Sequence, residues 1–247
     1  MLKGKELVDT LVAELVEIGV PVMAEALENL YSSPDFLEMD RLTLISKLVS
    51  AEYDTKVSRR LNTRLKTAKL IGCPAEIENC VDSDEREYRP SGISDVLSSL
   101  DFIDKGYNLC VLGASDVGKT YFAKALGVVA CRNYKVQYHH CEDVLDRLSA
   151  EKTDNRSRYE RRLRALIRSD LVILDDFLLH AIADEEEAKI LFTILENRLE
   201  QKRSTIICSQ RDPENWKAMI MDDEVSANAI LKRATKHYTV MIKAKTS

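Results

Sequence analysis

Leucine-valine pairs recur every four residues over 7–16, which predicts an amphipathic helix near the start of the chain. Gly19 ends this pattern, and Pro21 begins the next one at a position where a helix tolerates a missing N–H. A longer helical pattern covers residues 40–70, apolar on one face in its first half and basic in its second. Together these patterns predict a small all-helical domain over residues 1–70 whose last helix presents positive charge.

From residue 107 to residue 247 the pattern changes to short apolar runs that alternate with amphipathic helical stretches. The runs are almost continuously apolar, as in parallel strands that are covered on both faces. An α/β domain with a parallel five-stranded sheet and helices on both faces follows. The predicted strands are 108–112, 135–139, 171–174, 205–208 and 237–242.

The segment after the first of these strands has the residues and spacing of a phosphate-binding loop. It reads Gly113-Ala114-Ser115-Asp116-Val117-Gly118-Lys119-Thr120 and leads into an amphipathic helix. The glycines permit backbone conformations that a Cβ would block, while the loop N–H groups and the helix N-terminus direct partial positive charge at phosphates. The pattern predicts that Lys119 binds the β- and γ-phosphates and that Thr120 holds Mg²⁺. A chance glycine-rich turn before a helix is the alternative.

Two acids follow the third apolar strand, Leu171–Leu174. Open α/β sheets bind their ligands at the carboxyl ends of the strands, so both acids are expected near the loop. In a phosphate-loop ATPase, Asp175 would hold the Mg²⁺ shell and Asp176 would polarise the attacking water. A strand exit or a helix cap is the alternative interpretation. The loop and the acids together predict ATP and Mg²⁺ as ligands and hydrolysis as the reaction.

Three further features could complete such a site. Ser209 ends the fourth strand, where a polar side chain would hold the water or the γ-phosphate; a simple turn residue is the alternative. Arg233 precedes the fifth strand and would act on a neighbouring subunit's nucleotide as an arginine finger; a solvated helix end or a DNA contact is the alternative. The linker 71–106, with its Gly, Pro and acidic residues and one short helix, is expected to help form the adenine pocket.

Composition excludes several classes of protein. The 247 residues are 45% hydrophobic and 31% charged, which is typical of soluble globular proteins, and no run approaches the roughly 20 apolar residues of a membrane span. The N-terminus does not resemble a signal peptide, so we expect a cytoplasmic protein without a membrane partner. None of the six cysteines forms a Cys-x-x-Cys pair, and we expect reduced, buried thiols. His139-His140-Cys141 could indicate a metal site, but the end of a strand is favoured because no fourth ligand lies nearby in sequence.

The net charge of −5 gives no sign of nucleic-acid binding, but the distribution of basic residues does. Basic residues cluster over 54–70, 155–169 and 231–245, and such clusters on an acidic chain favour contacts with phosphate backbones. Solvated helix faces paired with acids elsewhere are the alternative. The candidate DNA contacts are Arg59, Arg60, Arg64, Lys66, Arg156, Arg158, Arg161 and Arg162.

The order of phosphate loop, Asp-Asp strand, polar strand end and Arg233 resembles AAA+ ATPases. The additional helical stretch at 142–169 resembles the initiator and helicase-loader branch of that group. The whole chain is similar to the IstB family of insertion-sequence transposition helpers. That similarity rests on 21–27, 34–37, the basic helix 61–70, 204–210, Trp216 and 229–233.

This resemblance implies an AAA+ ATPase that forms an ATP-dependent homo-oligomer on duplex DNA and recruits or activates a transposase for target-site selection. It also implies slow hydrolysis that DNA or a partner stimulates. Two alternatives stay open. A DnaC-like loader would use the same ATPase to deliver a replicative helicase, and an ATP-binding switch would barely hydrolyse its nucleotide.

Overall fold

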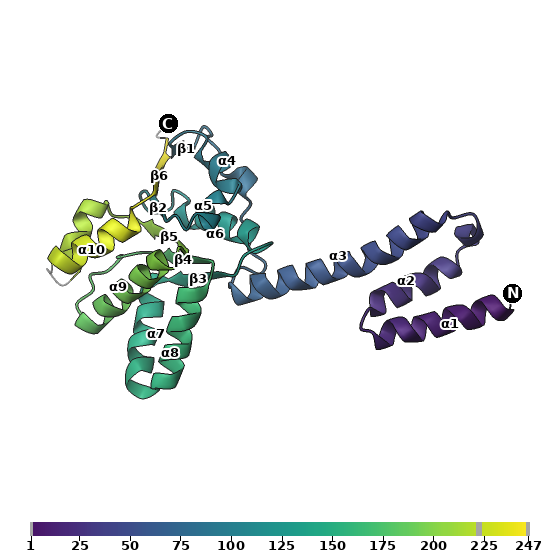
Figure 1. Ribbon diagram of the computed structural model, residues 1–247. Helices are drawn as coiled ribbons and strands as arrows, with labels where there is room; N and C mark the ends of the chain where they lie inside the picture. The colour runs from purple at the N-terminus through teal and green to yellow at the C-terminus, as the bar shows by residue number, and fades with distance from the viewer. Residues whose placement is uncertain (1, 221–223, 246–247) are drawn as a thin grey trace. The chain divides into compact units, whose positions relative to one another are not determined.

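Figure 1 shows the computed structural model of the chain, which describes residues 2–220 and 224–245. The chain divides into two compact units, with the boundary between Thr63 and Arg64. No helix within the described ranges is both long and apolar enough to cross a membrane. The two units are described separately below.

The N-terminal unit is all-helical, as its apolar pattern predicts. The helices α1 and α2 pack against each other, and Pro21 occupies the first position of α2. Glu52 of α3 accepts hydrogen bonds from the N–H groups of Val22 and Met23 at 2.9 and 3.0 Å. It thereby satisfies two donors that the first turn of a helix leaves without intrahelical partners. The elements are α1 (Leu2–Glu17), α2 (Pro21–Tyr31), a 3-10 turn (Pro34–Leu37) and α3 (Arg41–Thr67), whose last residues belong to the second unit.

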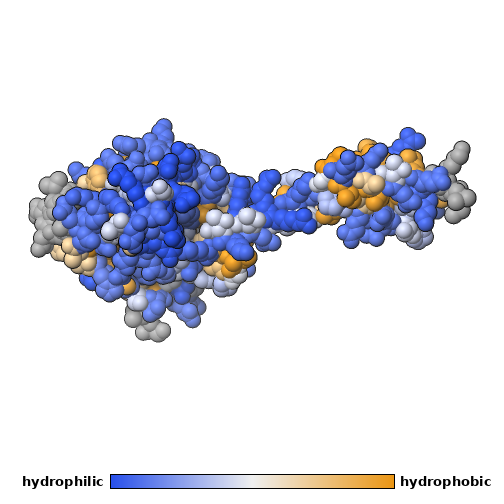
Figure 2. All heavy atoms as spheres, turned by 90° about the horizontal axis from the view of Figure 1, so that it is seen from below, coloured by the Kyte–Doolittle hydropathy of each residue, from blue (hydrophilic) through white to orange (hydrophobic). Residues whose placement is uncertain are grey.

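Much of the apolar pattern of this unit lies on its surface. In α1, Val8 is buried whereas Leu7 is 60% exposed, and in α3 Leu42 is 78% exposed. Ile45, Val49, Tyr53 and Val57 continue the exposed apolar side chains along α3. Figure 2 shows apolar side chains gathered over the helices of this unit. Grouped apolar surface of this kind is typical of interaction sites.

The second unit contains a six-stranded mixed sheet in the order β1-β6-β2-β5-β4-β3. The five parallel strands confirm the predicted α/β sheet. They are β2 (Leu109–Leu112), β3 (Val136–His140), β4 (Leu171–Asp175), β5 (Ser204–Ser209) and β6 (Tyr238–Ala244). The sixth strand, β1 (Arg86–Arg89), pairs antiparallel with β6 and lies within the segment expected to be a linker. It has four residues of which only Tyr88 is buried, a pattern too short and too polar to predict a strand.

Helices cover both faces of this sheet. One face, with Cys110, Val172 and Ile207, shares a core with α7, α8, α9 and α10. On the other face α6 packs against β4 and β5, where a Cβ on Gly127 would lie 2.8 Å from the Ile173 side chain. The helices are α4 (Ile93–Ser98), α5 (Asp101–Asp104), α6 (Lys119–Ala130), α7 (Cys141–Asp154), α8 (Arg156–Arg168), α9 (Glu185–Glu200) and α10 (Glu224–Ala234), with 3-10 turns at Ile77–Asn79 and Pro213–Met219.

A buried arginine joins α9 to its neighbours. The Arg198 side chain is fully buried, and its guanidinium donates to the Thr205 hydroxyl at 3.0 Å and to the Ser169 carbonyl at 2.9 Å. The carbonyls of Leu166, Ile167 and Ser204 accept its remaining hydrogen bonds. Burial lowers the pKa of Arg198 to about 9, so the group is still charged at neutral pH. A buried charge is tolerated here because all three guanidinium nitrogens donate to buried acceptors.

Candidate nucleotide-binding site

The phosphate loop connects the end of β2 to the start of α6. Its first glycine, Gly113, has φ 152°, and a Cβ there would collide with the Ile242 carbonyl oxygen of β6. The second, Gly118, has φ 102°, and its Cβ would lie 3.0 Å from the Arg86 guanidinium of β1. Both positions therefore favour glycine for backbone conformation, and Gly113 also requires it for the close approach of the β6 backbone. Because β2 lies between β6 and β5, the loop is fixed at the carboxyl ends of the central strands.

Lys119 lies at the start of α6 and is 6% exposed. Its ammonium group donates to the carbonyl oxygen of Ala114 within the loop. Burial lowers the pKa of Lys119, an effect that the nearby Cys208, Asp175 and Asp176 oppose. The side chain is thus folded over the loop, with carboxylates close enough to affect its charge.

A cavity of about 550 Å³ opens at this loop, within the range of roughly 300–1,000 Å³ that is typical of small-molecule sites. Ser115, Asp116, Gly118, Lys119 and Thr120 line one side of it. Residues 73–75 of the linker line it as well, and the contribution of this segment to an adenine pocket stays a prediction. The Tyr121 hydroxyl accepts the N–H of Glu76 at 3.1 Å and so holds the linker against the start of α6.

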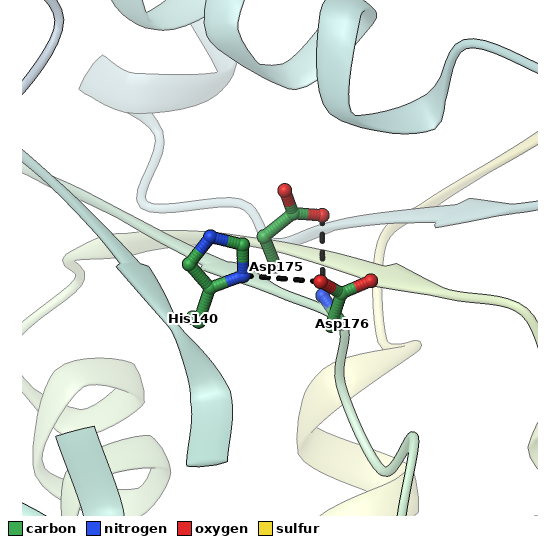
Figure 3. Close-up of side chains that lie close together, drawn as sticks. All are labelled: His140, Asp175 and Asp176. Atoms are coloured by element: carbon green, nitrogen blue, oxygen red, sulfur yellow. Dashed lines mark hydrogen bonds and ion pairs between the residues drawn. The ribbon is translucent and has the colours of Figure 1, made fainter. Parts of the chain in front are cut away.

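The two acids lie at the end of β4, as the strand pattern predicts, but in different surroundings. Asp175 is 1% exposed; its carboxylate accepts the Tyr138 hydroxyl at 2.7 Å and the N–H of Asp176 at 3.1 Å. The Asp176 side chain is 37% exposed and lines the cavity. Its Oδ2 lies 3.0 Å from Nδ1 of His140 at the end of β3 (Figure 3). Since a carboxylate only accepts, Nδ1 of His140 is the donor in this contact.

Residues of β3 therefore belong to the site, although sequence reasoning did not select them. Ligand atoms of His140, Asp175 and Asp176 all lie within 4.8 Å of one another. Burial, followed by the hydrogen bond to Asp175, raises the pKa of Tyr138, so this hydroxyl remains a donor to that carboxylate. The sequence signal was His139-His140-Cys141, which raised a metal site but was interpreted as the end of a strand because no fourth ligand lies nearby in sequence.

The donors at this edge suit a hard cation. Thr120 lines the cavity, and the Asp175 carboxylate is held in one orientation by two hydrogen bonds. Oxygen donors of this kind are the ligands that Mg²⁺ prefers, and it usually adds water and phosphate oxygens to one or two carboxylates. The residues present therefore fit the predicted ion.

Ser209 ends β5, but its side chain is fully buried beside the cavity and not in its lining. Its hydroxyl donates to the Phe177 carbonyl at 3.0 Å and accepts the Trp216 indole N–H at 3.3 Å. The next residue, Gln210, lines the cavity instead. Gln210, and not the predicted Ser209, is therefore the residue of this strand end that lines the cavity.

Arg233, near the end of α10, is bound within its own chain. Its guanidinium pairs with Glu196 of α9, donates to the Ala229 carbonyl at 2.7 Å and lies 4.7 Å from the centre of the Phe192 ring. A role on a neighbouring subunit would require it to leave Glu196. The trans role of Arg233 stays a prediction.

Comparison with known proteins matches the description "IstB-like ATP binding protein" to residues 13–247. The chain belongs to this family. Its IstB-like relatives include a protein of Bacillus thuringiensis subsp. berliner named for insertion sequence IS232 and ATP binding, 32% identical over 83% of this chain and 79% of that protein. A Sinorhizobium fredii protein, y4uH, named for an insertion sequence and ATP binding, is 33% identical over 89% of this chain and 86% of its own length.

Solved structures confirm the predicted AAA+ fold of this IstB-like chain. AMPPCP-bound DnaA from Aquifex aeolicus aligns with a TM-score of 0.56 and 20% identity, covering 69% of this chain and 50% of that one. The DnaC helicase loader aligns with a TM-score of 0.52 and 18% identity, covering 70% of this chain and 98% of that one. At these identities the likeness concerns the fold alone.

The candidate DNA contacts of this family member fall into two groups. Arg64 donates to the carbonyls of Cys131 and Arg132 at 3.3 and 2.6 Å at the end of α6, and Arg158 and Arg162 pair with Glu151. The remaining candidates do not pair with Glu151 or with the end of α6, and among them Arg156 pairs with Glu160 in the next turn of α8. This second group comprises Arg59, Arg60, Lys66, Arg156 and Arg161, all exposed; Arg158 of the first group is exposed as well.

Proposed function

We propose that this chain is a cytoplasmic ATPase that binds ATP with Mg²⁺, assembles as a homo-oligomer on duplex DNA and recruits or activates a transposase at the target site. The observation that carries the proposal is the cavity at the phosphate loop, which Lys119, Thr120 and Asp176 all line. Membership in the IstB-like family supports ATP as the nucleotide. The names of its relatives, which refer to insertion sequences, support the transposition setting.

Each residue of the site has a distinct role in this proposal. The loop N–H groups and Lys119 bind the phosphates, because both direct positive charge into the cavity. Thr120 and Asp175 hold Mg²⁺, which neutralises charge on the phosphates when it is bound. Asp176 polarises the attacking water, since it is the acid that faces the cavity. Gln210, at the end of β5, would orient that water or the terminal phosphate.

Assembly on DNA gives the remaining residues their roles. The exposed arginines of α3 and α8 would contact phosphates of the duplex, which supplies affinity without sequence preference. Arg233 would exchange Glu196 for the nucleotide of an adjacent subunit, as an arginine finger acting in trans. Nucleotide binding and assembly would then depend on each other.

The direct test is ATP turnover by the full chain with and without duplex DNA at low salt. We expect slow turnover that DNA stimulates, together with DNA binding that needs ATP. Equal ATP turnover with and without DNA, together with no ATP-dependent binding to the duplex, would reject the proposal. A pull-down that recovers a replicative helicase and no transposase would assign the same ATPase to helicase loading.

A mixing experiment tests the trans role of Arg233. Lys119→Ala and Arg233→Ala variants are each expected to be inactive, one without nucleotide and the other without the finger. In a random equimolar mixture about a quarter of subunit boundaries pair an intact nucleotide site with an intact arginine, so about a quarter of the turnover should return. A mixture as inactive as its components would exclude Arg233 as the finger.

The second candidate function is an ATP-dependent switch with little hydrolysis, which the bond between His140 and Asp176 favours. An acid held by an imidazole is less available to polarise water. Asp176→Asn distinguishes the two functions: if hydrolysis releases the protein from DNA, the variant stays bound where the wild type dissociates. Equal release of both proteins would favour the switch.

A further inference from the structure

The nucleotide cavity contains a second lysine, which lies outside the phosphate-loop motif. Lys124 belongs to the second turn of α6, four residues after Thr120, and both residues line the cavity. Residues four positions apart project from the same face of a helix, and long helical side chains lean toward the N-terminus of their helix. This geometry directs the side chain of Lys124 back toward the phosphate loop.

An aromatic ring holds the ammonium group of Lys124. Its Nζ lies 4.4 Å from the centre of the Tyr138 ring in β3, a contact that attracts a cation without neutralising its charge. The hydroxyl of the same ring donates to Asp175 at 2.7 Å. The ammonium group is therefore separated from the Asp175 carboxylate by one ring and one hydrogen bond, and it lies on the side of the cavity where Thr120 and Asp175 suit Mg²⁺.

The charge of Lys124 has no acidic partner. Within the described part of the chain its ammonium group makes neither a salt bridge nor a hydrogen bond, although the side chain is half-buried. Lys119, the other lysine in the cavity lining, donates to the Ala114 carbonyl. A partly desolvated cation gains free energy from a hydrogen-bonded counter-charge. An anionic group that enters the cavity would supply the partner that Lys124 lacks.

The terminal phosphate of a nucleoside triphosphate is the anionic group that fits this position. In the proposed site, Asp176 polarises the water that attacks this phosphate, so the phosphate lies between the loop and the acids at the end of β4. Lys124 lies on the same side of the cavity, because the ring beneath its ammonium group contacts Asp175. A nucleoside diphosphate lacks this phosphate and would leave Lys124 without a partner.

We propose that Lys124 binds the terminal phosphate of ATP and thereby makes the site discriminate ATP from ADP. The inference rests on the nucleotide site proposed above. A lysine has a flexible four-carbon stem and three N–H donors, so its ammonium group can turn from the Tyr138 ring to a phosphate oxygen while α6 stays in place. Lys124 is thus a specificity-determining residue, whereas Lys119, which also reaches the β-phosphate, would support the binding of either nucleotide.

The test measures the affinity of the full chain for AMPPCP, a triphosphate that resists hydrolysis, and for ADP, both with Mg²⁺, by isothermal titration calorimetry. Lys124→Met keeps the length of the stem and removes its charge. It should weaken AMPPCP binding by about tenfold or more, the effect of one charge-assisted hydrogen bond, and leave the affinity for ADP unchanged. Lys124→Arg keeps a cation and should restore most of the loss. The matched control is Lys135→Met, an exposed position outside the cavity lining, which should bind both nucleotides like the wild type.

The ratio of the two affinities is a readout that a purely structural role of Lys124 would not change. If the lysine only packed on Tyr138, Lys124→Met would lower the melting temperature without nucleotide and weaken AMPPCP and ADP alike. Equal losses of affinity for the two ligands would therefore overturn the assignment to the terminal phosphate. Unchanged affinity for both ligands would overturn the inference as a whole.

A pair of Tyr138 variants tests whether the ring positions the lysine. Tyr138→Phe and Tyr138→Leu both lose the hydrogen bond to Asp175, and only the first keeps a ring beneath Lys124. The phenylalanine variant should prefer AMPPCP to ADP more strongly than the leucine variant, and equal preferences would overturn the positioning role of the ring.

Failure of this inference is distinguishable from failure of the proposed function. A wild-type chain that binds neither AMPPCP nor ADP would overturn both. If Lys124→Met binds like the wild type while Lys119→Ala abolishes binding, the proposed nucleotide site stands and the role of Lys124 is overturned.

Discussion

Replacing Glu151 by glutamine probes the predicted DNA surface directly, because this acid holds two of its arginines. The Glu151 carboxylate accepts Nε and Nη2 of Arg162 at 2.7 and 2.8 Å and pairs with Nε of Arg158 at 3.0 Å. Glu151 is 8% exposed, whereas the Arg158 side chain is 60% exposed. Glutamine keeps the size of the side chain and removes its charge, so both arginines should become available to phosphates.

The expected gain in DNA affinity follows from the number of arginines released. Each additional phosphate contact steepens the fall of log affinity with log salt by about 0.9, so two contacts steepen it by about 1.8. Over a fourfold decrease in salt, this slope adds about tenfold in affinity beyond the change in the wild type. The variant should therefore bind more tightly at low salt and lose its advantage at high salt.

The same substitution should destabilise the fold by about 1–3 kcal/mol, because it removes charge-assisted hydrogen bonds from a mostly buried acid. Hydrogen bonds from Arg162, and then the charges of Arg162 and Arg158, hold the pKa of Glu151 below its ordinary value of 4.5. A carboxyl with a depressed pKa stabilises the folded state fully above that ordinary value. The stabilisation is lost as pH falls through the lower, folded-state pKa. Wild type and variant should thus converge in stability below pH 4.5.

Fluorescence anisotropy of a labelled duplex, titrated at several salt concentrations, measures the slope. The matched control is Glu185→Gln, which removes the same charge from an exposed acid paired with Lys189 outside the basic clusters. Equal slopes for Glu151→Gln and Glu185→Gln would refute a role for Arg158 and Arg162 at the duplex. Urea unfolding at pH 7 and pH 4 checks the stability change.

Three further substitutions test the nucleotide site and its support. Lys119→Ala should abolish binding of a fluorescent ATP analogue, whereas Asp176→Asn should preserve binding and stop turnover; loss of binding in both would contradict the separate roles. Gly113→Ala should also abolish ATP binding, because its Cβ would collide with the Ile242 carbonyl; wild-type affinity in a titration would show that the loop adapts. Arg198→Met should lower stability by about 3 kcal/mol or more, because it leaves a cluster of buried acceptors without donors. Thermal unfolding would then fall by about 10 °C, and an unchanged melting temperature would show that the arginine contributes no net stability.

Most of the fold was predictable because its signals are local. Apolar runs mark β2, β4 and β5 most clearly, and Gly19 and Pro21 separate the first two helices. The strand β1 was missed because it owes its existence to pairing with β6, and its residues Arg86–Arg89 carry no strand pattern of their own. Likewise, the leucine-valine repeat predicts α1 but not which of its residues are exposed.

In the candidate site, too, the local segment was predictable from sequence and the contacts between strands were not. The phosphate loop is one continuous segment, so its spacing alone identifies it. His140 and Gln210 join it only because β3, β4 and β5 are neighbours in the sheet, an arrangement that a linear sequence does not state. The pairing of Arg162 with Glu151 and of Arg233 with Glu196 is equally invisible in sequence. Charge clusters predict a basic surface, but the fold decides which of its cations are already paired.

ATP-dependent assembly on duplex DNA is the central claim, and the mass of the complex tests it most directly. Sedimentation velocity of the full chain with a short duplex should show large DNA-bound oligomers when ATP and Mg²⁺ are present. These oligomers should be absent without nucleotide and absent for Lys119→Ala with it. The same distribution of sizes in all three samples would contradict the account, because nucleotide in the phosphate loop would then have no part in assembly.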